Sequence, residues 1–156
     1  MIFLRMVLLE MVIYMQNDRQ MLSSILKTAQ MGQISIQKAL DSSMRPGLRK
    51  ALQSQLQEYD AIESEAYALA TQRVWELREI QPGRSMVTCI MTHMKLRHGN
   101  TDSKIADMMI QGNTQGMILG LKNLHQYQQQ DSQVSALSQR LIDCETANIR
   151  QLQTFL

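Results

Sequence analysis

The feature of this chain that most constrains its fold is a run of apolar residues at alternating spacings of three and four. Because an α-helix makes one turn in about 3.6 residues, such spacing places the side chains on one helix face. The pattern predicts one helix over about 18–43 and a second over about 47–79. The two stripes consist of Leu22, Ile25, Ala29, Gly32, Ile36 and Leu40, and of Leu48, Leu52, Leu56, Tyr59, Ile62, Ala66, Leu69 and Leu77.

Helix start and stop signals divide the rest of the chain. Asn17-Asp18 and Pro46 are typical of helix starts, and Gln81-Pro82-Gly83 predicts the end of the second helix. A weaker helix is predicted over about 85–97. Asp102 and Asp131 are predicted N-caps of a helix over about 103–129 and of a last helix. The last helix carries the apolar residues Val134, Leu137, Leu141, Cys144, Ile149, Leu152 and Phe155.

The composition supports an all-α fold. Aromatic residues make up 4 % of the 156 residues, and the chain has 2 prolines and 7 glycines, too few for a β-sandwich or barrel. Short connections predict an antiparallel pair of helices at each end of the chain, whereas the middle connection, about 80–101, is long. These lengths predict an up-down-down-up four-helix bundle with a short extra helix in the long crossover.

The first residues, "MIFLRMVLLEMVIYM", are treated as a separate apolar N-terminal extension, 1–17, ahead of a bundle domain, 18–156. Arg5 and Glu10 interrupt this stretch, and it is too short to span a membrane. No cleavage site typical of a signal peptide follows it. Two interpretations stay open: an upstream extension with Met15 as the true start, or an apolar helix that docks on the bundle or on a partner.

The stretch "IQGNTQGMILGLKNL" places Gly112, Gly116 and Gly120 four residues apart on one helix face. A phosphate-binding loop is excluded, because no strand precedes these glycines and no Lys-Ser or Lys-Thr follows them. Polar residues within the stretch disfavour a membrane helix pair. Close helix packing is predicted, with Gly32 of the first helix as the facing partner. A local ligand-binding notch and a helix bend are the alternatives.

The segments "SKIADMMIQGNTQGMILGLKNLHQY" and "RLIDCETANIRQL", with "LRKALQSQLQEYDAIESEA" as a weaker echo, resemble the ferritin-like superfamily. Within this superfamily the chain resembles the small bacterial ferritin-like proteins of unknown function, and the resemblance covers about 18–156. It implies a four-helix bundle with one long crossover. In the iron-binding members, four carboxylates and two Glu-x-x-His motifs hold two metal ions in the bundle core.

This chain departs from that plan, because no Glu-x-x-His motif occurs in it. A di-iron centre and its oxidase activity are therefore not expected, and neither a cofactor nor a catalytic residue is assigned. Glu63, Glu145, Asn148 and Asp107 are the candidates for an alternative polar core that holds a cation or a ligand. The competing interpretation places them at the edge of the apolar stripes, in contact with water.

Other chemistry-bearing residues give weaker signals. Cys89 and Cys144 are far apart, as is typical of free thiols in a cytoplasmic protein. A formal charge of +2 and a single small basic cluster, "HMKLRH" at 93–98, do not indicate nucleic-acid binding. Tyr59 and Tyr67 are predicted at the helix edge with solvated hydroxyls.

Two functions follow as expectations. The favoured one is a non-catalytic structural or protein-interaction module without the di-iron ligands, which forms a homo-oligomer such as a dimer or binds a protein partner. The alternative is a metal- or small-ligand-binding bundle with an atypical polar core. No integral membrane segment is expected.

Overall fold

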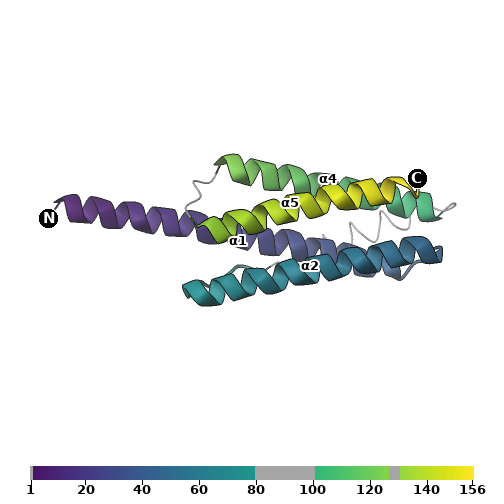
Figure 1. Cartoon of the computed structure of the whole chain (residues 1–156), viewed down its shortest axis with the longest axis horizontal. Helices are drawn as coiled ribbons and strands as arrows, with labels where there is room; N and C mark the ends of the chain where they lie inside the picture. The colour runs from purple at the N-terminus through teal and green to yellow at the C-terminus, as the bar shows by residue number, and fades with distance from the viewer. Residues whose placement is uncertain (1, 80–100, 127–130) are drawn as a thin grey trace.

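Four long helices form the described part of the protein, a computed structural model that describes residues 2–79, 101–126 and 131–156. They are α1 (Ile2–Leu40), α2 (Pro46–Arg73), α4 (Thr101–Gln126) and α5 (Ser132–Gln153), packed side by side along a common axis (Figure 1). No strand occurs among these residues, so the all-α prediction is confirmed there. None of the described helices is long and apolar enough to cross a membrane.

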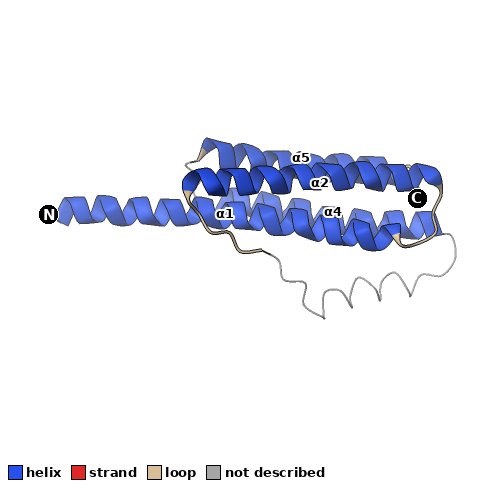
Figure 2. Ribbon diagram, turned by 90° about the horizontal axis from the view of Figure 1, so that it is seen from below, coloured by secondary structure: helices blue, strands red, loops and turns tan. Residues whose placement is uncertain are grey.

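The helix directions follow from contacts at the two ends of the bundle (Figures 1 and 2). At one end, the Arg45 N–H before α2 donates to the Asp102 carboxylate in the first turn of α4, at 3.1 Å. At the other end, Arg73 of α2 pairs with Asp131 before α5, and the Asp131 N–H donates to Asp18 of α1 at 3.2 Å. Hence α1 and α5 run one way, and α2 and α4 run the other way.

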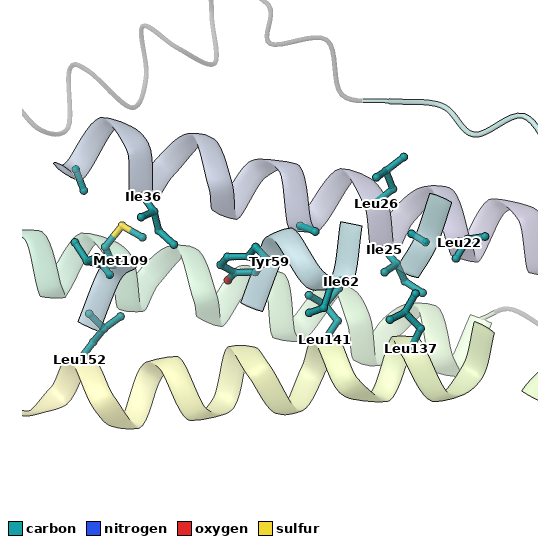
Figure 3. Packing of buried hydrophobic residues seen from close by; sticks show 14 of the residues in the cluster. Leu22, Ile25, Leu26, Ile36, Tyr59, Ile62, Met109, Leu137, Leu141 and Leu152 are labelled. Carbon is teal, nitrogen blue, oxygen red and sulfur yellow. The ribbon is translucent and has the colours of Figure 1, made fainter. Parts of the chain in front are cut away.

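A continuous apolar core lies between the helices (Figure 3). Every helix contributes buried apolar side chains, and most residues of the apolar stripes predicted for α1, α2 and α5 face this core. Burial of a large apolar side chain contributes about 1.5–3 kcal/mol, so the core is the main source of stability. Its largest members include Met21, Leu22, Leu26, Ile36, Leu48, Leu52, Tyr59, Ile62, Leu137 and Leu152.

The first helix begins much earlier than its predicted start at Asn17-Asp18, which is wrong. α1 runs without a break from Ile2 to Leu40. No proline or glycine stands before Asp18 to stop the helix, and the Asp18 carboxylate accepts from Asp131 instead of capping its own helix. The predicted extension and the predicted bundle domain are thus joined by one continuous helix.

The N-terminal part of α1 projects beyond the other three helices (Figures 1 and 2). We call residues 2–16 the arm. Its described side chains do not dock on the bundle of the same chain, because they are exposed to solvent. The exposed fractions are 80 % for Ile2, 81 % for Phe3, 67 % for Leu4, 56 % for Met6, 53 % for Leu8 and 63 % for Leu9.

Two other boundaries differ from the predictions. α2 ends at Arg73 instead of about 79, where Val74 takes a left-handed conformation with φ 56°. This turn brings Trp75 and Leu77 back against the core, and their burial outweighs the cost of a left-handed β-branched residue. Asp102 lies inside the first turn of α4 and not at its N-cap.

The predicted N-cap at Asp131 is confirmed. Its carboxylate accepts from the N–H groups of Gln133 and Val134. The predicted crossover helix, Cys89, the basic cluster at 93–98 and the turn at 128–130 lie outside the described residues.

Candidate functional site

A cluster of four buried polar side chains interrupts the apolar core midway along the bundle. Tyr59 comes from α2, Asn113 from α4, and Glu145 and Asn148 from α5. Their exposed fractions are 2 %, 3 %, 2 % and 5 %, respectively. Figure 3 shows the Tyr59 ring among the apolar side chains of the core. Burial of polar groups is costly unless they are hydrogen-bonded, so the contacts within this polar cluster decide whether the core is stable.

The Tyr59 hydroxyl is the centre of the polar cluster. It lies 2.9 Å from Glu145 Oε2 and 3.0 Å from Asn113 Oδ1. Asn148 Nδ2 donates to Asn113 Oδ1 at 3.1 Å. Asn113 Nδ2 donates to the carbonyl of Met109, one turn back in α4, at 2.7 Å. Three helices are therefore cross-linked through one hydroxyl group.

The number of protons available in the polar cluster indicates that Glu145 is protonated. Tyr59 has one hydroxyl proton but contacts two oxygen acceptors. If the Tyr59 hydroxyl donates to Asn113 Oδ1, a protonated Glu145 can donate to the Tyr59 oxygen. The Tyr59–Asn113 contact and the Tyr59–Glu145 contact then each contain one proton. If Glu145 is ionised, its carboxylate accepts the hydrogen bond from the Tyr59 hydroxyl. The oxygens of Tyr59 and Asn113 then lie 3.0 Å apart with no proton between them.

The electrostatics agree with this proton count. Burial raises the pKa of Glu145 to about 8, although the hydrogen bond from Tyr59 opposes the shift. No lysine, arginine or histidine is paired with Glu145 in the described ranges. Burial, followed by the nearby Glu145 charge, raises the pKa of the Tyr59 hydroxyl above its ordinary value. The same two causes raise the pKa of the Cys144 thiol to about 12, so this free thiol stays protonated at neutral pH.

A cavity of about 420 Å³ lies between α1 and α4 and reaches the polar cluster. Glu145 and Tyr59 are part of its lining. Gln111, Gly112, Gln115 and Leu119 are exposed at its mouth, so the cavity opens to solvent along α4. The remaining lining residues are Thr28, Met31, Gly32, Ser35, Met108, Met109, Asn113 and Gly116.

The predicted packing glycines have different environments. A Cβ added at Gly32 would lie 2.5 Å from the Tyr59 ring, and one at Gly116 would lie 2.7 Å from Glu145 Oε1. At Gly120 an added Cβ would meet Ile142 at 2.8 Å, whereas at Gly112 it would meet nothing within 4 Å. Gly32 therefore faces a tyrosine of α2 rather than the glycines of α4, and Gly112 leaves open space at the mouth of the cavity.

The four predicted polar-core candidates are not brought together. Glu145 and Asn148 are buried in the polar cluster, so for them the interpretation as water-contacting edge residues is wrong. Glu63 is partly exposed and accepts from Gln30 at 3.1 Å and from Gln33 at 3.3 Å. Asp107 is also partly exposed and accepts from Gln111, one turn along α4.

Sequence reasoning missed two members of the polar cluster. Tyr59 was predicted at a helix edge with a solvated hydroxyl, but its hydroxyl is buried because Gly32 makes room for the ring. The signal for Tyr59 was its place in the apolar stripe of the second helix. Asn113 is adjacent to Gly112 in a stretch for which close helix packing is predicted, with a ligand-binding notch and a helix bend as alternatives. Tyr67, in contrast, is exposed as predicted, and partial burial together with Glu79 raises its pKa to about 12.

The described residues contain no group of three or more His, Cys, Asp or Glu side chains arranged to hold a metal ion. Of the three histidines, only His125 is described, and it is exposed near the end of α4. The chain matches no protein family model, no curated protein and no solved structure at a significant level.

Proposed function

We propose that this protein is a non-catalytic, ferritin-like helical bundle that acts as a protein-interaction module and dimerises through the arms of two copies. Support for the bundle type comes from the helix directions, which are those of two antiparallel hairpins joined by one long crossover. The observation that carries the interaction function is the arm itself, a projecting helix with exposed apolar side chains that its own bundle does not cover.

A second copy of the chain is the partner that best fits the arm. Ile2, Met6 and Leu9 are spaced four and three residues apart, and Ile13 continues the sequence pattern. This spacing is that of the a and d positions of a coiled coil, in which Arg5 takes a g position and Glu10 the following e position. In a parallel pair, the Arg5 side chain of each copy would therefore lie near Glu10 of the other.

The position of this apolar line is also favourable for packing. At about 100° per residue, Ile2, Met6 and Leu9 lie nearly opposite the face on which Asp18, Leu22 and Ile25 enter the core. Gln20, on the same side as the apolar line, is exposed. Two arms could thus pair on the side of α1 that points away from its bundle, and the two bundles would not collide.

The energetics require that the arms pair along their length. Association costs about 4–15 kcal/mol in lost freedom of motion and ordering. A fully buried large apolar side chain contributes about 1.5–3 kcal/mol, so one or two buried residues are not enough to offset that cost. Lengthwise pairing buries three or more such residues in each copy.

The test compares substitutions at two adjacent leucines of the arm, Leu8 and Leu9. We expect Leu9→Glu to shift the dimer to monomer, because it places a charge in the paired face. Leu8→Glu, on the other side of the arm, is the matched control and is expected to leave the dimer intact. Sedimentation equilibrium of the wild type and both variants measures this. A monomeric wild type, or equal weakening by both substitutions, would overturn the proposal.

A further inference from the structure

The cavity between α1 and α4 contains a polar atom without a partner. Glu145 Oε2 is hydrogen-bonded to Tyr59, but no hydrogen bond to Glu145 Oε1 is made by any described residue. The side chain is 98 % buried by its exposed fraction of 2 %, and it lines the cavity. Gly116 leaves room for this oxygen, since an added Cβ would lie 2.7 Å from it. This carboxyl oxygen faces the open cavity, where a water molecule or the donor group of a ligand can bind to it.

The rest of the cavity is mainly apolar. Met31, Met108, Met109 and Leu119 provide flexible, polarisable walls, and the volume of about 420 Å³ lies within the range of small-molecule sites. Among the described residues, Glu145 is the only acidic side chain in the lining, and none of the described lining residues is basic. A ligand complementary to this site therefore has an apolar body and one positively charged group.

We propose that this cavity binds an organic amine, with the ammonium group on Glu145 Oε1 and the apolar body between the methionines of α1 and α4. Binding exchanges one proton. The ammonium group keeps its protons, Glu145 loses its proton to the buffer, and the resulting carboxylate accepts from the ammonium at Oε1 and from the Tyr59 hydroxyl at Oε2. A charged hydrogen bond in a water-poor cavity is stronger than the neutral contact that it replaces.

This exchange makes amine binding depend on pH. The titratable groups that face Glu145 are Tyr59 from α2 and Cys144 from α5 itself. The cavity residues contributed by α1 and α4 carry no titratable group. The pKa values of Tyr59 and Cys144 are raised, so both stay neutral, and of these three groups only Glu145 changes its charge between pH 5 and 9.

The experiment uses hexylamine as the probe and 1-hexanol as a neutral molecule of similar shape. The methyl signals of labelled methionines report binding by NMR. Because the pKa of Glu145 is about 8, we expect hexylamine to bind about 100-fold more tightly at pH 9 than at pH 6. Hexanol should show no such dependence, and Glu145→Gln should lose the preference for the amine.

A second variant keeps the test independent of any folding defect in Glu145→Gln. Gly112→Leu places a large side chain at the mouth of the cavity, at a position where an added Cβ meets nothing within 4 Å. Gly112 is not a member of the polar cluster, so we expect the hydrogen bonds of that cluster to remain. It should abolish hexylamine binding. Equal and pH-independent binding of hexylamine and hexanol, no methionine shifts with either probe, or undiminished binding to Gly112→Leu would overturn the proposal.

Discussion

At the scale of single residues, Glu145 determines how the core responds to pH. It is a carboxyl group enclosed by apolar side chains and held by one phenol, Tyr59. In the unfolded chain its pKa is near the ordinary value of 4.5, whereas in the bundle it is about 8. Because these two pKa values differ, the free energy of unfolding depends on pH.

The direction in which pH changes the free energy of unfolding follows from whether Glu145 holds its proton in the folded and in the unfolded state. Between pH 4.5 and 8 the folded protein keeps the Glu145 proton and the unfolded chain loses it. We therefore expect the contribution of Glu145 to the free energy of unfolding to fall as pH rises through this window. It should be complete below pH 4.5 and lost by pH 8, an effect on the order of 3–5 kcal/mol.

Glu145→Gln removes the titrating proton and retains the shape and a donor to Tyr59. The wild type should therefore become less stable relative to Glu145→Gln as the pH is raised from 5 to 9, in urea unfolding followed by circular dichroism. Glu63→Gln is the matched control, because it removes one carboxylate from a partly exposed site outside the polar cluster. A constant difference between wild type and Glu145→Gln across this range would contradict the assignment of a neutral Glu145.

At the scale of elements, α4 has three glycines with different roles. Each glycine costs about 1 kcal/mol in helix propensity relative to alanine, so the surroundings must explain its presence. At Gly116 and Gly120 the explanation is the space needed by Glu145 and Ile142 of α5. At Gly112 no neighbouring atom requires that space, and the opening of the cavity is what the missing side chain provides.

The two glycines that line the cavity can be compared directly. Gly112→Ala should stabilise the protein by up to about 1 kcal/mol, because the helix gains propensity and the new methyl group meets open space. Gly116→Ala should destabilise it by about 1–3 kcal/mol, because the methyl group displaces the Glu145 carboxyl from Tyr59. Chemical denaturation at pH 7 measures both, and a stabilising Gly116→Ala would show that the carboxyl moves freely.

At the scale of the whole molecule, the arm and the cavity are separate features of one bundle. The arm extends from the end where α1 meets Asp131, and the cavity opens midway along α1 and α4. Dimerisation by the arms leaves the mouth of the cavity on α4 uncovered. The two proposals are therefore independent, and the failure of one does not affect the other.

A parallel pairing of arms also predicts which charge variants will form heterodimers with each other. Arg5→Glu gives an arm with two acidic residues, and Glu10→Arg gives one with two basic residues. Each alone should dimerise more weakly than the wild type, because like charges face each other across the pair. An equal mixture of the two should form a heterodimer, detectable by native mass spectrometry, whereas a statistical mixture would argue against the parallel register.

The sequence by itself determined the helical class and most of the helix faces, because apolar spacing and capping residues act locally. The stripes of α1 and α2 face the core, and the cap at Asp131 forms as its residue type predicts. The start of α1 was missed because Asp18 bonds to another element, and the end of α2 was missed because Trp75 and Leu77 pack back on the core.

The site was decided by the tertiary structure. Nothing in the order of residues shows that Asn113 and Glu145 both contact the Tyr59 hydroxyl, since the three residues come from three helices. Their burial depends on where the glycines of α1 and α4 leave room, which is a property of packing between helices. Local physics therefore accounts for the elements, and only the assembled bundle accounts for the polar cluster, its raised pKa values and the cavity beside it.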